Sequence, residues 1–284
     1  MKLLIEPSVK RDNYYDTDGI ILPLEGFSVE SKIFFTILEI KEIVNKFNGE
    51  VFIKINKNIL NKDIEKLKDI MIELDSLNIK GIFFYDLALL QLKKELSLNV
   101  DLVWNQTHMV NNYETCNYYH SKGVSYALLG KEITLDEIIE IKKNSSIIPM
   151  VEVVSLPSVA FSRRKLITNY FHDLNIAKKD DLLIKEKVTN GYYKLLEDDN
   201  GTSFFYNNIL NGTGVIKDLY DNGIDYIIIR EFGIEDIFDC LIKDTKDYIN
   251  NNCSSIDYVN KYKILGDYTN FFFKKTIYKV KKNG

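Results

Sequence analysis

Residues 51–103 decide the fold of this 284-residue chain: VFIKINKNILNKDIEKLKDIMIELDSLNIKGIFFYDLALLQLKKELSLNVDLV. Three short apolar runs, at 51–55, 81–85 and 101–103, alternate with two stretches whose apolar residues recur at helical spacing, 63–77 and 87–96. The runs are apolar at nearly every position, which is typical of parallel strands buried on both faces. This stretch therefore predicts consecutive β–α–β units with right-handed crossovers.

The same rhythm extends over most of the chain. The remaining apolar runs lie at 3–5, 19–22, 126–129, 147–154 and 226–229, and the remaining helical patterns at 31–47, 112–121, 134–143 and 214–222. Eight strands that alternate with helices indicate a closed, TIM-barrel-like (β/α)8 fold of class α/β. The first connection, 7–18, is short and polar, so we expect an irregular first unit.

One region interrupts the rhythm between the seventh and eighth predicted strands. Residues 171–213 lack a clean helical stripe, and aromatic residues alternate on both sides of Asn200-Gly201, which predicts a β-hairpin. An insertion after a barrel strand lies over the carboxyl-terminal mouth of the barrel. We therefore expect a single domain over 1–284, with an insertion at 171–213 and a basic C-terminal tail at 271–284.

Composition narrows the classes of partner. The 37 basic and 41 acidic side chains give a net charge of −4, so any contact with nucleic acid needs a local patch, for which the basic tail is one candidate. No run of 18 apolar residues occurs, so we expect no contact with a membrane. The N-terminus lacks the apolar core of a signal peptide, which predicts a cytoplasmic protein.

Candidate site residues are the polar and aromatic side chains that follow the predicted strands, because barrel enzymes carry their chemistry at the carboxyl ends of strands. The residues that we expect to bind substrate are Asn56, Asp86, Trp104, Asn105, Thr107, Glu152, Arg163, Arg164 and Asn169. Structural alternatives stay open for five of them: Asp86 and Asn56 are also good caps, Trp104 is also a good packing residue, and Arg163 and Arg164 also suit a solvated turn. The two arginines suit a phosphate or carboxylate, since guanidinium presents a planar fork of donors.

Common catalytic motifs are missing from the sequence. It contains no Gly-rich phosphate loop, no Gly-x-Ser-x-Gly elbow and no His-Glu-x-x-His. The three histidines are scattered, so we expect no metal site. The catalytic residues therefore stay unassigned at this stage.

Several segments, in order along the chain, resemble peptidase family U32. They are Val103-Trp104-Asn105-Gln106-Thr107, Asn111 to Gly123, Pro149-Met150-Val151-Glu152-Val153, Ser162-Arg163-Arg164-Lys165-Leu166, Glu197 to Thr202 and the closing 272–282. The resemblance implies a TIM-barrel-like catalytic domain. The family was named for collagenase-like peptidase activity, and its better understood members act in hydroxylation of tRNA wobble uridines and of the ubiquinone ring, several with an iron–sulfur cluster held by four cysteines.

The resemblance implies a role in tRNA wobble-uridine hydroxylation, as an enzyme or a subunit, with tRNA and a paralogous U32 subunit as partners. The sequence departs from the family at Val154-Ser155 and Ser158, where a His-Gly pair and a cysteine are usual. Only three cysteines occur in the whole chain, so we expect no iron–sulfur cluster and no other cofactor. Arg230-Glu231 replaces the family's Lys-x-Asp/Glu-Gly at the end of the eighth predicted strand.

Two other functions stay open. One is a peptidase, for which Ser158 or Ser162 with His108 would have to supply a nucleophile and its base. The other is a non-catalytic scaffold that has kept the barrel and lost its chemistry.

Overall fold

The computed structural model describes residues 1–12, 14, 17–106, 108–179, 182–187 and 191–266. Thr107 and the basic tail at 271–284 lie outside these described residues. Eight parallel strands form a closed barrel, as the sequence predicts, because the ring β13-β1-β2-β3-β4-β5-β6-β7 closes through the pairing of β7 with β13. The strands are β1 (Lys2–Glu6), β2 (Gly19–Pro23), β3 (Glu50–Ile55), β4 (Gly81–Phe84), β5 (Asp101–Trp104), β6 (Tyr126–Leu128), β7 (Ile148–Ser155) and β13 (Tyr226–Arg230).

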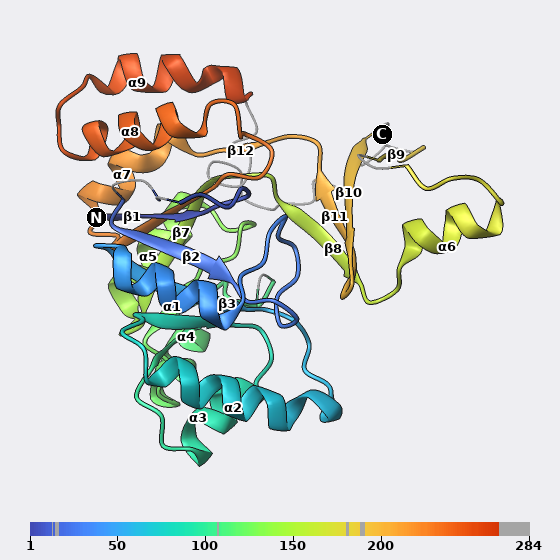
Figure 1. The fold of residues 1–284 in the computed structure, drawn as a ribbon. Helices are drawn as coiled ribbons and strands as arrows, with labels where there is room; N and C mark the ends of the chain where they lie inside the picture. Colours follow the sequence, from blue (N-terminus) through green and yellow to red (C-terminus); the bar gives the residue numbers. More distant parts are fainter. Residues whose placement is uncertain (13, 15–16, 107, 180–181, 188–190, 267–284) are drawn as a thin grey trace, which may run out of the picture.

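Helices surround the barrel (Figure 1). They are α1 (Ile37–Lys46), α2 (Ile64–Asp75), α3 (Ala88–Glu95), α4 (Tyr113–Ser121), α5 (Leu135–Asn144), α7 (Ile216–Asp221), α8 (Phe238–Ile249) and α9 (Ser255–Lys261), with short 3-10 turns η1 (Asn61–Asp63), η2 (Thr213–Val215) and η3 (Tyr262–Leu265). The described part of the connection between β1 and β2 contains no helix, which confirms the irregular first unit. None of the helices in the described part of the chain is both long and apolar enough to cross a bilayer.

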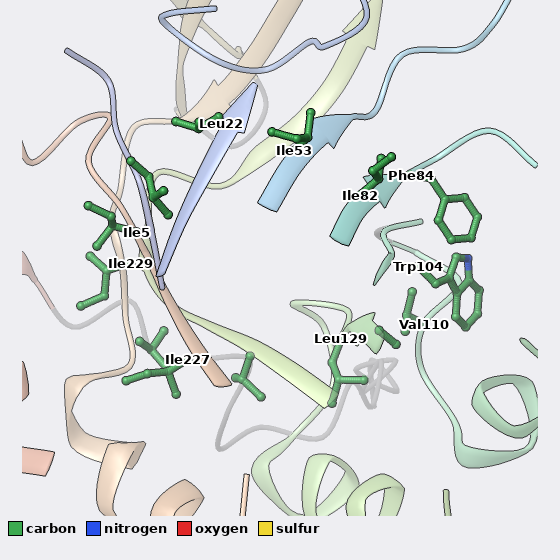
Figure 2. Close-up of a cluster of buried hydrophobic side chains, with 14 of the residues drawn as sticks. Ile5, Leu22, Ile53, Ile82, Phe84, Trp104, Val110, Leu129, Ile227 and Ile229 are labelled. Atoms are coloured by element: carbon green, nitrogen blue, oxygen red, sulfur yellow. The ribbon is translucent and has the colours of Figure 1, made fainter. Parts of the chain in front are cut away.

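Side chains alternate between the two faces of each strand, as the pleat requires. Those that point outward pack against the helices in the main hydrophobic cluster, which includes Ile5, Ile53, Phe84 and Trp104 (Figure 2). Those that point inward fill the barrel, where the ring of Phe52 makes edge contacts with the rings around it. The inward cluster consists of Leu4, Ile21, Phe52, Phe83, Val103, Tyr126, Leu128, Met150, Tyr226 and Ile228.

The insertion forms a second, antiparallel sheet beside the barrel, in the order β8 (Ser158–Ser162), β11 (Gly201–Tyr206), β10 (Tyr192–Asp198) and β9 (Leu183–Lys185). The predicted hairpin is confirmed, because β10 and β11 pair around a turn in which the Asp198 carboxylate accepts the amides of Asn200 and Gly201. Gly201 has a φ of +146°, and a Cβ there would lie 2.0 Å from the carbonyl oxygen of Ser162, so the turn requires glycine.

The second sheet takes in residues that precede the expected start of the insertion at 171. Both β8 and the helix α6 (Leu166–Asp173) belong to it, and α6 packs Ile167 and Phe171 onto Leu195 of β10. Sequence alone does not separate β8 from β7, because only Leu156 and Pro157 lie between them. After the sheet, β12 (Leu210–Asn211) pairs antiparallel with β7 and returns the chain to the barrel.

Candidate functional site at the barrel mouth

The inward faces of the strands change from apolar to polar at their carboxyl ends. Two residues beyond the apolar layer, the period-two alternation places Glu6 on β1, Lys54 on β3, Glu152 on β7 and Arg230 on β13, and Asn105 directly after β5. All five side chains are buried or nearly so. The barrel therefore has a polar layer at the end where this fold carries its chemistry.

A cavity of about 220 Å³ lies between this polar layer and the second sheet. Its barrel side includes Lys54, Asn56, Asn58, Tyr85, Asn105, His108, Lys131, Glu152 and Arg230. Its roof, formed by β8 and β11, includes Ser158, Val159, Ala160, Phe161 and Phe205. The insertion thus covers the mouth, and the cavity has a polar floor and a partly aromatic roof.

Five charged side chains form a chain of alternating sign across the barrel mouth. Lys131 Nζ lies 2.6 Å from Glu152 Oε1, and Arg230 Nε lies 2.6 Å from Glu152 Oε2. Arg230 also pairs through Nη1 with Glu6, whose other oxygen lies 2.9 Å from Lys54 Nζ. Because each carboxylate has two cationic partners, the layer is compact and its members are held in place.

These contacts fix the charge states of the two carboxylates. Burial opposes ionisation of Glu152, but Arg230 and Lys131 outweigh it and hold the pKa at about 2. The pKa of Glu6 is also lowered, because Arg230 and Lys54 outweigh its burial. Burial lowers the pKa of Lys54, although Glu6 opposes the shift. Glu6 and Glu152 are therefore anions at neutral pH and cannot serve as proton donors there.

Two amide side chains face the cavity with hydrogen-bonding capacity to spare. Asn56 Oδ1 accepts the amide of Val29 at 2.9 Å, which leaves its NH2 group for a ligand. Asn105 is 7% exposed, and its side chain makes no hydrogen bond among the described residues. An amide offers both donors and acceptors, so this pair suits a planar ligand with alternating carbonyl and N–H groups.

Glu30 connects the roof to the barrel. It has a φ of +59°, a backbone conformation that is unfavourable for a side chain with a Cβ, and it lines the cavity. Its Oε1 accepts a hydrogen bond from Ser158 Oγ on β8 at 2.5 Å. Nearby, Asn200 Nδ2 donates to the carbonyl of Ser28 at 3.1 Å, so the loop between β2 and α1 holds the second sheet in position.

The structure brings together three of the predicted site residues, Asn56, Asn105 and Glu152, around one cavity. Asp86 lies outside the lining and takes its capping alternative, since its carboxylate accepts the amides of Ile59 and Ala88, each at 2.9 Å. Thr107 is outside the described residues.

Trp104 takes its packing alternative, because it faces the helices and not the cavity. Its ring stacks on Tyr119 of α4 at 3.8 Å between centroids, and its Nε1 donates to Gln106. The physical reason is the strand alternation: Val103 and Asn105 point inward, so the residue between them points outward.

Arg163, Arg164 and Asn169 do not line the cavity. All three are exposed, on the segment that leaves β8 and enters α6. They follow the roof strand and not the barrel strand β7, which the sequence alone could not distinguish. The mouth instead uses Glu6, Lys54, Lys131 and Arg230, which were not predicted as site residues.

The cysteines do not fit a four-thiolate iron–sulfur cluster. Cys116 is buried on α4, where burial raises the pKa of its thiol to about 12, while Cys240 and Cys253 are exposed. A fourth cysteine does not exist in the sequence. Within the described ranges, no three His, Cys, Asp or Glu side chains converge in a way that could hold a metal ion.

Known proteins resemble this chain over most of its length. The profile of peptidase family U32 matches residues 15–233. The chain is 27% identical over 260 residues to tRNA hydroxylation protein P2 of Bacillus subtilis (strain 168), with 84% of each protein covered. It is 22% identical over 161 residues to tRNA hydroxylation protein P1 of the same organism, with 55% of this chain and 38% of that protein covered.

A solved structure of a U32 peptidase has a similar fold. The two chains superpose with a TM-score of 0.51 at 14% identity, covering 82% of this chain and 94% of the other. At that identity the likeness establishes the common barrel architecture alone.

Proposed function

This chain belongs to peptidase family U32, and on that premise we propose that it acts in the hydroxylation of a tRNA wobble uridine, as the enzyme or as a subunit of it. The observation that carries the proposal is the relation to tRNA hydroxylation protein P2, which extends over 84% of both proteins. The family profile matches residues 15–233, a range that includes the barrel strands from β2 to β13 and the insertion that roofs the cavity.

The cavity suits a nucleobase taken out of its stack. A uracil edge presents two carbonyl oxygens on either side of an N–H, which complements the amides of Asn56 and Asn105. Phe161 and Phe205 in the roof offer apolar ring surface against which a base can pack. Enzymes that modify a base commonly extrude it into such a closed pocket.

The peptidase alternative has less support from the geometry. Ser158 Oγ donates to Glu30. His108 Nδ1 lies 3.7 Å from Glu132 Oε1, and 67% of the His108 side chain is exposed. Among the described residues, no hydrogen bond joins His108 to Ser158 or Ser162. A serine nucleophile needs a base within hydrogen-bond reach, so the predicted pairs lack the arrangement that proteolysis requires.

We also propose that the chain holds no iron–sulfur cluster of its own and that it binds tRNA. Its three cysteines cannot supply four ligands, so any iron–sulfur chemistry in the pathway would belong to another protein. A paralogous U32 subunit is the partner that we propose, since the chain is related to both P1 and P2.

Deletion of the gene, followed by mass spectrometry of nucleosides from purified tRNA, tests the proposal. We expect hydroxylated wobble uridine to fall in the deletion strain and to return with the wild-type gene. The matched pair Asn105→Ala and Asn99→Ala then locates the site, because Asn99 is an exposed asparagine just before β5, at the opposite end of the barrel. Asn99→Ala should restore the modification and Asn105→Ala should not.

Unchanged hydroxylation in the deletion strain would overturn the proposed function. Full restoration by Asn105→Ala, in a strain that needs the wild-type gene, would instead favour the non-catalytic scaffold.

A further inference from the structure

Three of the predicted site residues do not line the cavity and lie together on an exposed part of the insertion. Arg163 and Arg164 lie between β8 and α6, and Asn169 and Tyr170 lie on α6, where 60% of the surface of Tyr170 is exposed. We call these four residues the β8–α6 surface. On the same helix, Ile167 and Phe171 are buried against the second sheet, so Asn169 and Tyr170 belong to the solvent side of α6.

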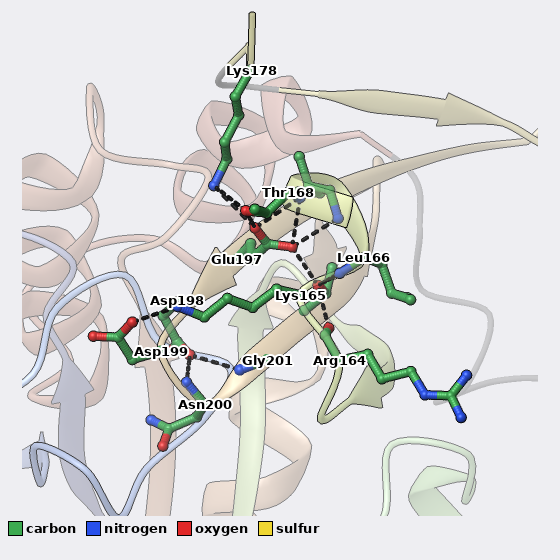
Figure 3. Close-up of polar contacts among 12 residues, drawn as sticks. Arg164, Lys165, Leu166, Thr168, Lys178, Glu197, Asp198, Asp199, Asn200 and Gly201 are labelled. Atoms are coloured by element: carbon green, nitrogen blue, oxygen red, sulfur yellow. Dashed lines mark hydrogen bonds and ion pairs between the residues drawn. The ribbon is translucent and has the colours of Figure 1, made fainter. Parts of the chain in front are cut away.

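The two arginines of this surface are not neutralised. Residues 158–170 contain three basic side chains and no acidic one. Lys165 pairs with Asp199 at 2.6 Å, but neither Arg163 nor Arg164 forms an ion pair within the described part of the chain. In Figure 3 the Arg164 side chain extends away from the polar cluster around Glu197.

The carboxylate of Glu197 is hydrogen-bonded to this segment, and its acceptor capacity is used by groups of the chain itself. Its side chain is 2% exposed and accepts hydrogen bonds from the amides of Ile167 and Thr168, from the Thr168 hydroxyl and from Lys178. It therefore fills the N-terminus of α6, so the helix end is not open to an external anion. The attraction for an anion must come from the arginine side chains themselves.

The β8–α6 surface begins where the cavity roof ends. Phe161 lines the cavity, and Arg163 comes two residues later, just past the end of β8 at Ser162, so at most about 7 Å of backbone separates them. That separation is on the scale of one nucleotide. A base held in the cavity would thus bring its neighbouring phosphates to the arginines and its neighbouring base to Tyr170.

We propose that the β8–α6 surface binds the RNA backbone next to the modified nucleotide, with Arg163 and Arg164 on phosphates and Tyr170 stacked on an adjacent base. This inference rests on the proposed function and adds the place where the RNA is held. With a net charge of −4, the chain needs such a local patch to bind a polyanion.

The test measures binding of an in vitro transcribed tRNA to the full chain at several salt concentrations. Arg163→Ala/Arg164→Ala should weaken binding about tenfold and reduce the slope of log affinity against log salt by about 1.4 to 2, because two phosphate contacts are lost. Tyr170→Ala should weaken binding about tenfold with an unchanged slope, since a stacking contact carries no charge. Arg163→Lys/Arg164→Lys should recover the slope.

Lys94→Ala/Lys143→Ala is the matched control. It also removes two exposed positive charges, from the last turns of α3 and α5. We expect binding and slope to stay at wild-type values. The side chains of Arg163 and Arg164 make no hydrogen bond or ion pair with the described residues. Circular dichroism and thermal unfolding of the arginine variant should therefore match the wild type.

The remaining outcomes separate this inference from the proposed function. Wild-type affinity and slope in the arginine variant would overturn the inference, even if the deletion strain lacks the modification. Loss of tRNA hydroxylation with unchanged tRNA binding would assign the surface to a protein partner and would also overturn it. A failure of the proposed function would appear separately, as unchanged hydroxylation in the deletion strain.

Discussion

Glu152→Gln is the substitution that most directly tests the charged layer at the barrel mouth. The side chain of Glu152 is 1% exposed and lies 2.6 Å from both Lys131 Nζ and Arg230 Nε. Glutamine keeps the size of the side chain and removes its charge. Arg230 then retains only Glu6, and Lys131 loses its partner, so two cations are left poorly compensated.

The pKa of Glu152 gives the magnitude. The value falls from 4.5 to about 2 on folding, and a difference of about 2.5 at about 1.4 kcal/mol per pH unit corresponds to about 3–4 kcal/mol of stability at neutral pH. Removal of one partner of a buried ion pair costs roughly 3–5 kcal/mol in other proteins, which agrees. Because the folded pKa is the lower one, this contribution is complete above pH 4.5 and is lost as the pH falls towards 2.

Urea unfolding of the wild type and of Glu152→Gln at two pH values checks both size and sign. We expect a difference in the free energy of unfolding of about 3–4 kcal/mol at pH 7 and about 2 kcal/mol at pH 3.5. Glu42→Gln is the control, since Glu42 is exposed on α1, and it should change stability by less than about 0.5 kcal/mol. A loss below about 1 kcal/mol at pH 7, or the same loss at both pH values, would refute the electrostatic reasoning.

Three further substitutions or modifications test other parts of the structure. Glu197→Gln should speed hydrogen exchange of the first α6 amides about tenfold at pH 7, because these amides donate to the Glu197 carboxylate. In the wild type, the protection of these amides should decrease as the pH falls below 4.5 towards the pKa of Glu197, which is about 2. Equal exchange rates in the two proteins would contradict this. Trp104→Ala should lower the free energy of unfolding by about 3–5 kcal/mol in a urea titration, since it empties a buried site beside Tyr119, and a loss under about 1 kcal/mol would argue against that packing. Iodoacetamide should label Cys240 and Cys253 in the native protein but Cys116 only after denaturation, which peptide mass spectrometry would detect; native labelling of Cys116 would contradict its burial.

The sequence was informative about the barrel because burial on both faces makes its strands nearly continuous apolar runs. That pattern located all eight strands of the ring and the irregular connection after the first. It also located the hairpin, whose turn depends on Asn200-Gly201. The strand β8 was not found, because it follows β7 after Leu156-Pro157 and its own residues are half-exposed.

The sequence was less informative about which residues face the cavity, because position at a strand end does not determine which way a side chain points. Parity along the strand does determine it: Asn105 faces the cavity and Trp104 does not. The same rule would have found Lys54, a single charge inside the apolar run VFIKI, and Glu6, two residues beyond the inward Leu4. A charge in a run that is otherwise buried is costly unless it is paired, so it indicates a partner elsewhere in the fold.

Because the charges at the barrel mouth balance, the cavity and the β8–α6 surface would contribute to binding in different ways. The barrel mouth holds three cations, Lys54, Lys131 and Arg230, against the carboxylates of Glu6, Glu30 and Glu152, so these charges cancel and exert little attraction at a distance. Binding that depends on the cavity alone would then be selective but weak, and only slightly sensitive to salt. Under the proposed function, a strongly salt-dependent affinity for tRNA must come from charges outside the mouth, and Arg163 and Arg164, which follow the roof strand β8, supply two such charges.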